Sequence, residues 1–135
     1  MAIDRIERGR AAHAFQTVYD YITRLPDEKG RKEYVAHLKK VPSMIQVNGL
    51  GQTLAFLYAK GGQDHVVYRQ LESWLRHNPA EILPPYDEGQ NGGFVKTVVN
   101  LPSREYRIMT KEALALLNWM RRFAGGLKDD LEQRG

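Results

Sequence analysis

The sequence predicts an all-α fold, a compact bundle of about five to six helices with no significant sheet. Apolar residues recur every three to four positions through most of the chain, which is the period of a helix with one buried face. Prolines and glycines interrupt these periodic stretches at short intervals. The one stretch rich in β-branched residues, 94–101, has no second strand with which to pair, so we favour a short helix over a strand there.

The first periodic stretch covers residues 3–25 and ends at Pro26, whose ring does not fit inside a helix. A second helix is expected over residues 27–41, with an aspartate as N-cap and Pro42 as its end. Lys39 and Lys40 would then occupy its last turn, where cations complement the helix dipole. That position alone is enough to explain this basic pair.

Residues 43–60 predict a central helix that carries two glycines, Gly49 and Gly51. Each costs roughly 1 kcal/mol against alanine inside a helix. We expect the compensation to be the close approach of a second backbone over a shallow face made of Asn48, Gly51 and Ala55. The alternative is a phosphate-binding turn at residues 49–51. Such a turn needs a preceding strand and a third glycine, and the helical spacing instead runs straight through.

The remaining elements follow from their end signals. Asp64 is expected to cap a fourth helix that ends near residues 77–79. Residues 79–102 predict an exposed, mobile loop that contains the short helix. The last helix is expected to begin at Thr110 and to end at residues 125–126, which are glycines, leaving a frayed charged tail over 127–135.

Length and composition predict one globular domain, residues 1–135, because 42% of the residues are hydrophobic. We expect no membrane segment and no signal peptide, since no long apolar run occurs. The absence of cysteine agrees with a cytoplasmic location. The net charge of +4 permits an anionic partner, although a solubilising surface is the simpler interpretation of charge alone.

Titratable residues do not form a recognisable catalytic pattern. No two of the four histidines stand at the spacing that would place two imidazoles on one helix face for a metal ion. The carboxylates are scattered, and no phosphate-loop, nucleophile or zinc motif occurs. We therefore predict no catalytic residues, no metal and no cofactor. A metal-dependent RNA-processing nuclease built from distant carboxylates remains the enzymatic alternative.

Binding of a phosphate backbone is the better-supported chemistry, because basic residues gather along the first helix and at predicted helix ends. The candidate RNA-binding residues are Arg5, Arg8, Arg24, Lys39, Lys40, Lys60, Arg121 and Arg122. Four tyrosines offer rings for base stacking, namely Tyr19, Tyr21, Tyr58 and Tyr68. Tyrosines at helical spacing more often belong to a core or an interface. Such contacts would depend strongly on salt and little on RNA sequence.

Two sequence blocks, taken together, resemble a known family. The first is Leu38-x-x-Val41-Pro42-Ser43-Met44-Ile45-x-x-Asn48-Gly49-Leu50-Gly51-Gln52-Thr53-Leu54-Ala55-Phe56. The second is Tyr106-Arg107-x-x-Thr110-x-Glu112-Ala113-Leu114-x-Leu116-Leu117-x-Trp119-x-Arg121-Arg122-Phe123-Ala124. Both resemble the small subunit of the type III-B CRISPR–Cas RNA-targeting effector complex, also called the Cmr complex.

The resemblance implies a small helical protein that is not the nuclease of its complex. Several copies would stack into a filament beside the backbone subunits that hold the guide RNA, and they would help to bind target RNA in antiviral defence. The motif residues Gly49, Gly51, Ala55 and Trp119 would be structural. A helical protein–protein adaptor unrelated to RNA is a further alternative, and its binding would not depend on salt.

Overall fold

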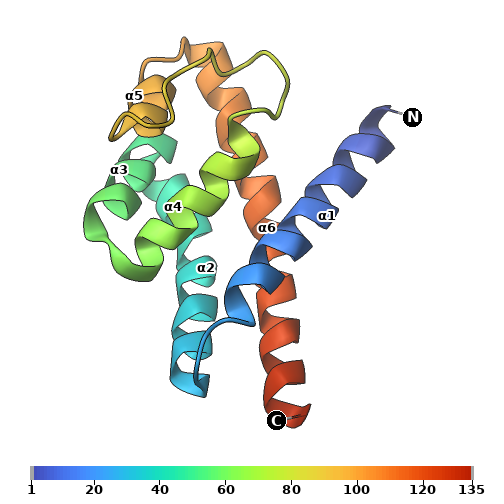
Figure 1. Ribbon diagram of the computed structural model, residues 1–135. Coiled ribbons are helices and arrows are strands. Elements are labelled where there is room, and N and C mark those ends of the chain that lie inside the picture. The colour runs from blue at the N-terminus through green and yellow to red at the C-terminus, as the bar shows by residue number, and fades with distance from the viewer. Residues whose placement is uncertain (1, 135) are drawn as a thin grey trace. The chain divides into compact units, whose positions relative to one another are not determined.

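The structure is a computed structural model that describes residues 2–134, with side chains described for residues 7–133. Over this range the chain forms six helices and no strand, which confirms the predicted all-α class (Figure 1). Backbone contacts divide the chain into two compact units. Unit 1 comprises residues 1–42 and 115–135, and unit 2 comprises residues 43–114. The organisation of the whole chain as one domain stays a prediction.

Unit 1 contains α1 (Ala2–Ile22), most of α2 (Glu28–Asn48) and the second half of α6 (Ser103–Arg134). Asp27 caps α2 as predicted, with its Oδ1 accepting a hydrogen bond from the Gly30 amide at 2.8 Å. Each helix supplies a stripe at helical spacing to the core. The fully buried side chains of unit 1 include Ala14, Val18, Ile22, Tyr34, Leu38, Val41, Leu116, Leu117, Met120 and Ala124.

The boundary between the second and third helices differs from the prediction. Pro42 lies inside α2, which continues to Asn48, so neither Pro42 nor Ser43 marks a helix end. Val41 and Ile45, on either side of the proline, are buried at 0% and 2% exposure. Their burial offsets the backbone hydrogen bond that a proline removes. The helix ends instead at Gly49, where φ is +89°, a conformation that favours glycine.

The last helix is longer than predicted at both ends. It begins at Ser103, so Thr110 is an interior residue whose Oγ1 donates to the Tyr106 carbonyl at 2.9 Å. It also continues through Gly125 and Gly126 to Arg134, so the expected frayed tail is helical. Ion pairs hold this end, because Glu132 contacts Lys128 at 2.8 Å and Arg31 of α2 at 3.6 Å. Together with apolar packing they outweigh the cost of two interior glycines.

Unit 2 contains α3 (Leu50–Lys60), α4 (Gly62–Leu75), α5 (Gly93–Val99) and the first part of α6. Helix α3 packs against α4 and α5 (Figure 1). Helix α5 confirms the short helix predicted near residues 94–101. Asp64 does not cap α4, because Gly61 holds that position and Asp64 is buried within the first turn. The core of unit 2 includes Leu50, Leu54, Leu57, Val67, Tyr68, Leu71, Leu75, Phe94, Val98, Met109 and Ala113.

The connection over residues 79–92 is irregular, as predicted, but it is not wholly exposed. Leu83 is buried and Tyr86 is half-buried, so two side chains anchor the connection to unit 2. Among the described residues, no helix is both long and apolar enough to cross a membrane.

Candidate functional site

The formal charge is divided unequally between the two units. Unit 1 contains thirteen Lys and Arg residues against nine Asp and Glu residues, a net charge of +4. Unit 2 contains seven of each and is formally neutral. The whole net charge of the protein therefore belongs to unit 1, and an anionic ligand would be attracted there first.

One side of α2 carries four lysines, which we call the lysine face: Lys29, Lys32, Lys39 and Lys40. All four side chains are exposed. At 100° per residue they fall within an arc of about 100°, and they extend over about 17 Å of helix. Glu33 borders this arc. Four cations in a row on one rigid helix can contact successive phosphates without contacting bases.

The lysine face corrects the interpretation of Lys39 and Lys40 as last-turn residues. Because α2 continues to Asn48, both lie in its middle, and complementing the helix dipole does not explain them. Lys29 and Lys32 were missed as candidates. The available signal was that Lys32, Lys39 and Lys40 stand 3, 10 and 11 residues after Lys29, because these offsets return to the same side of a helix with 3.6 residues per turn.

The other predicted basic residues are dispersed. Arg8 on α1, Arg24 in the turn after α1 and Arg122 on α6 are exposed residues of unit 1. Arg121 is half-buried and donates to Asn118 Oδ1 at 2.9 Å. Like Arg122, it lies inside α6 and not in a final turn. The Arg5 side chain lies outside the described residues. Lys60 is exposed at the end of α3 and belongs to the neutral unit 2.

Several further cations of unit 1 are neutralised by carboxylates of the same unit. Arg10 pairs with Glu7, and Arg31 and Lys128 pair with Glu132. The hydrogen bond between Lys128 and Glu132 raises the pKa of Lys128 and lowers the pKa of Glu132. Only the pair of Arg31 and Glu132 joins two helices, α2 and α6, and the other two pairs lie within one helix. A cation that is already paired with a carboxylate attracts a phosphate less strongly.

Trp119 of α6 makes two contacts within unit 1. Its Nε1 donates to Glu7 Oε1 at 2.6 Å, and its ring stacks on Phe123 with centroids 5.6 Å apart. The first contact joins α6 to α1 across 112 positions of sequence. A carboxylate acceptor strengthens the hydrogen bond and fixes the orientation of the indole ring.

In unit 2, Gly51 of the glycine motif lies against Tyr106 of α6. The Gly51 amide donates to the Tyr106 hydroxyl at 2.6 Å. A Cβ added at Gly51 would lie 3.0 Å from Val99 Cγ1 and 3.2 Å from Tyr106 Oη. The predicted close approach is thus present at Gly51, but side chains make it and not a second backbone. Asn48 and Ala55, the other members of the predicted shallow face, are exposed.

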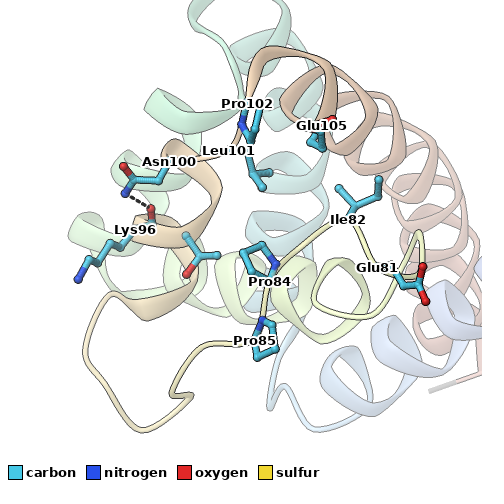
Figure 2. A pocket seen from close by; sticks show the side chains of 10 residues that line it. Glu81, Ile82, Pro84, Pro85, Lys96, Asn100, Leu101, Pro102 and Glu105 are labelled. Carbon is cyan, nitrogen blue, oxygen red and sulfur yellow. Dashed lines mark hydrogen bonds between the residues drawn. The ribbon is translucent and has the colours of Figure 1, made fainter.

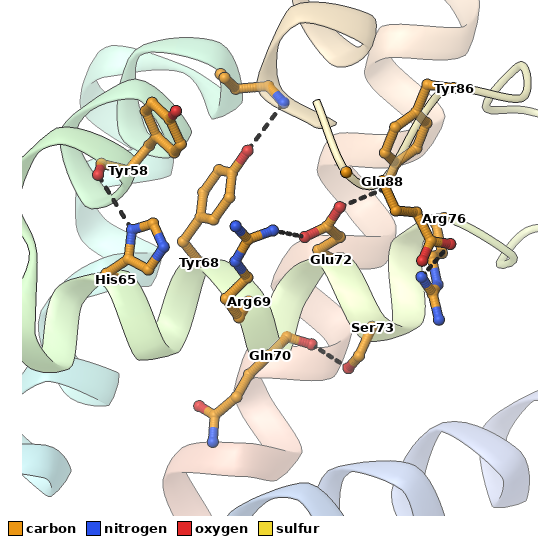
Figure 3. Close-up of polar contacts among 12 residues, drawn as sticks. Tyr58, His65, Tyr68, Arg69, Gln70, Glu72, Ser73, Arg76, Tyr86 and Glu88 are labelled. Carbon is orange, nitrogen blue, oxygen red and sulfur yellow. Dashed lines mark hydrogen bonds and ion pairs between the residues drawn. The ribbon is translucent and has the colours of Figure 1, made fainter. Parts of the chain in front are cut away.

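Two buried carboxylates of unit 2, Glu72 and Glu112, accept hydrogen bonds from side chains of α4 and of the irregular connection, and Figure 3 shows those of Glu72. Glu72 of α4 accepts the Tyr86 hydroxyl at 2.7 Å and pairs with Arg69 at 2.7 Å. Burial, with the hydrogen bond to Glu72 as a second cause, raises the pKa of Tyr86. Glu112 of α6 accepts Trp74 Nε1 at 2.7 Å. These bonds attach the irregular connection and α6 to α4.

Unit 2 also contains an open cavity of about 480 Å³ beside α5. Its walls are Ile82, Pro84, Pro85, Leu101 and Pro102, with polar side chains at the rim (Figure 2). Asn100 is engaged there, since its Nδ2 donates to the Lys96 carbonyl at 2.8 Å. No histidine lines this cavity. Its two carboxylates, Glu81 and Glu105, lie beside the apolar residues named above.

Histidines and carboxylates of the described residues form no group of three or more that could hold a metal ion. His65 is engaged in unit 2, where its Nδ1 lies 3.1 Å from the Tyr58 carbonyl oxygen. Burial lowers the pKa of His13 on α1. Unit 1 thus offers a basic surface, whereas Glu72 and Glu112 of unit 2 connect segments of that unit.

Comparison with known proteins agrees with the two sequence blocks. A family model described as "CRISPR-associated protein (Cas_Cmr5)" matches residues 6–127. A protein of Thermus thermophilus described as "CRISPR system Cmr subunit Cmr5" is 27% identical over 123 residues, covering 91% of this chain and 99% of its own.

A crystal structure of a CRISPR-associated Cmr5 family protein, also from Thermus thermophilus, has a similar fold, with a TM-score of 0.70. It is 22% identical in sequence and covers 90% of this chain and 98% of its own. The resemblance read from residues 38–56 and 106–124 is therefore confirmed. The chain belongs to the CRISPR-associated Cmr5 family, the small subunits of the type III-B Cmr complex.

Proposed function

We propose that the chain is a non-catalytic structural small subunit of a CRISPR RNA-guided RNA-silencing effector complex in the cytoplasm. Copies of it stack beside the backbone subunits that carry the guide RNA, and they help to hold target RNA during antiviral defence. Family membership supports the place in the complex. The observation that carries the RNA contact is the charge division, with +4 on unit 1 and none on unit 2.

The lysine face of α2 is the part of unit 1 that we assign to the RNA backbone. Its side chains are exposed, and a helix holds their Cα positions fixed before any ligand arrives. One chain offers few such contacts, so the isolated protein binds RNA weakly and with a clear dependence on salt. Copies in a filament act together, since each bound face raises the effective concentration of RNA at the next.

A surface function also agrees with the state of the titratable groups. Catalysis by a general acid and base needs two such groups that converge on a substrate. Here Glu72 and Glu112 are buried and bonded to tyrosine, arginine or tryptophan. Their role as connectors between segments supports a structural protein.

Reconstitution tests this proposal. The tagged chain is added to the remaining subunits of the cognate effector complex, loaded with guide RNA, and the complex is captured through another subunit. We expect the chain to be captured, and target RNA to be retained more strongly with it than without it. A folded chain that is not captured would contradict the proposed place in the complex.

The enzymatic alternative is tested on the same preparation. The purified chain is incubated with target RNA and with Mg²⁺, Mn²⁺ or Zn²⁺ in turn. We expect the RNA to remain intact. Cleavage that a chelator abolishes, and that follows the chain through purification, would contradict a non-catalytic role.

A further inference from the structure

Four aromatic side chains form a continuous row between α1 and α6 within unit 1, which we call the aromatic row. Tyr19 stacks on Phe15, with centroids 5.8 Å apart and 21° between the ring planes. Phe15 meets Phe123 edge to face at 5.3 Å, and Phe123 stacks on Trp119 at 5.6 Å. Phe15 and Tyr19 are 38% and 43% exposed, so the row reaches solvent.

Core packing does not account for the exposed end of this row. The core positions of α1 are already occupied by Ala14, Val18 and Ile22, each at 0% exposure. Phe15 and Tyr19 are four residues apart and form a separate stripe on the same helix. Contiguous apolar side chains that are exposed to water mark interaction sites, whereas single ones are common on any protein surface.

Arginines lie in register with the rings on both helices. Arg8 stands seven residues before Phe15, which is two turns along the same stripe of α1. Arg122 stands three residues after Trp119 on α6. Both side chains are exposed. A row of rings with a guanidinium on each helix matches a ligand that has flat apolar faces and anionic links between them, which describes single-stranded nucleic acid.

The row is also held in place before any ligand binds. The hydrogen bond from Trp119 Nε1 to Glu7 fixes the indole at one end. Among the described residues, Tyr19 and Trp119 each contact one other ring of the row, whereas Phe15 and Phe123 each contact two. Tyr19 is the exposed end of the row, at 43% exposure, and can therefore extend the stack by one base at little cost in side-chain ordering.

We propose that the aromatic row stacks unpaired bases of RNA whose phosphates contact the basic residues of unit 1. This inference rests on the proposed function, because it adds base contacts to a surface assigned to the RNA backbone. Every base has a flat face, so the row would favour unpaired over paired nucleotides and would tolerate any sequence. A protein ligand is disfavoured by the net charge of +4 on the same unit, which selects for anions.

The test compares two labelled strands of equal length and charge, an oligoadenylate of about 12 nucleotides and its abasic counterpart, at about 50 mM salt. The Phe15→Leu, Tyr19→Leu double variant removes both exposed rings and keeps apolar bulk. Phe56→Leu is the matched control, because Phe56 is 40% exposed and belongs to unit 2. Fluorescence anisotropy measures binding, and thermal unfolding verifies that each variant is folded.

We expect the wild type to bind oligoadenylate more tightly than the abasic strand. The double variant should lose about tenfold in affinity for oligoadenylate and nothing for the abasic strand. The control should match the wild type on both strands. If the folded double variant binds both strands as the wild type does, the inference is wrong, while salt-dependent binding of the abasic strand would leave the proposed backbone contact intact.

Two other outcomes would also overturn the inference. A wild type that binds neither strand would remove the proposed RNA contact together with the base contact. A double variant that binds RNA normally but is no longer captured with the other effector subunits would identify the row as a protein-docking surface.

Discussion

The two units of this protein are built from the same kind of helix but use their charges in opposite ways. In unit 2, seven cations balance seven carboxylates, and the buried carboxylates Glu72 and Glu112 bind donors from distant segments. In unit 1 the cations outnumber the carboxylates by four, and the lysine face and one end of the aromatic row, Phe15 and Tyr19, lie exposed. Both units use some polar groups for their own cohesion, but only unit 1 has an excess of cations, which is why we assign the proposed RNA contact to it.

The largest expected effect concerns RNA affinity. Changing Lys29, Lys32, Lys39 and Lys40 to glutamine removes the lysine face. We expect the affinity of the chain for a single strand to fall about 100-fold at low salt, or about 2.7 kcal/mol, because each lost phosphate contact also loses its counterion release. Filter binding or anisotropy would measure the loss.

The matched control removes the same charge from unit 2. Lys96, Arg104, Arg107 and Lys111 are all exposed there, and their change to glutamine alters the net charge equally. We expect the affinity to fall less than tenfold, through the change in long-range field alone. Equal losses from the two quadruple variants would show that the charge division has no part in binding.

The second effect concerns stability and contrasts two tyrosines. Tyr86→Phe leaves the buried Glu72 carboxylate without one donor, and we expect it to cost about 2 kcal/mol of unfolding free energy. Tyr19→Phe on the exposed row should change stability by less than about 0.5 kcal/mol. Urea unfolding measures both, and a Tyr86→Phe variant as stable as the wild type would contradict the structural role of the Glu72 contact.

The same tyrosine predicts a dependence on pH. Because the pKa of Tyr86 is raised above its ordinary value of 10.0 in the folded state, the unfolded chain loses its proton first. The stabilising contribution is therefore complete below pH 10.0 and is lost as the pH rises above that value. In Tyr86→Phe this alkaline loss should be smaller, which unfolding measured across that range would show.

The third effect contrasts two glycines whose positions differ from the prediction. Gly49 was expected inside a helix and lies at a helix end, whereas Gly126 was expected at a helix end and lies inside α6. Gly49→Ala should cost about 1 to 2 kcal/mol, because φ is +89° there and ψ is 161°, a region almost restricted to glycine. Gly126→Ala should instead stabilise the protein by up to about 1 kcal/mol, since α6 runs through it and a Cβ there meets nothing within 4 Å. Chemical denaturation distinguishes the signs.

The smallest effect belongs to His13 of unit 1. Burial holds its pKa below the ordinary value of 6.5, so the unfolded chain takes up a proton first as the pH falls. The contribution of neutral His13 to the free energy of unfolding is therefore present above pH 6.5 and is lost as the pH falls below that value. In His13→Gln, the free energy of unfolding should depend less on pH in this range. We expect the difference from the wild type to be below about 1 kcal/mol, because the ring is only half-buried. An unchanged profile would contradict this assignment.

The sequence allowed the helical class, the family and the short helix α5 to be predicted, because each depends on local periodicity or on a motif. It did not allow the ends of α2 and α6 to be predicted. Pro42 and Gly126 are both signals that usually end a helix. Tertiary contacts outweighed them, through buried Val41 and Ile45 in one case and the ion pairs of Glu132 in the other.

The candidate basic residues were also only partly predicted from local sequence signals. Lys39 and Lys40 were found because they are adjacent, whereas Lys29 and Lys32 were missed because their common face appears only when the spacing along the whole helix is compared. The division of net charge between the units could not be seen either, because unit 1 combines the two ends of the chain.

Nuclear magnetic resonance of the labelled full chain, titrated with a single-stranded RNA, tests the central claim most directly. We predict that the amide signals that shift belong to residues 7–42 and 115–133, with the largest changes along the lysine face and beside Phe15 and Tyr19. Shifts concentrated in residues 43–114, or a spectrum that RNA leaves unchanged, would contradict the assignment of RNA binding to unit 1.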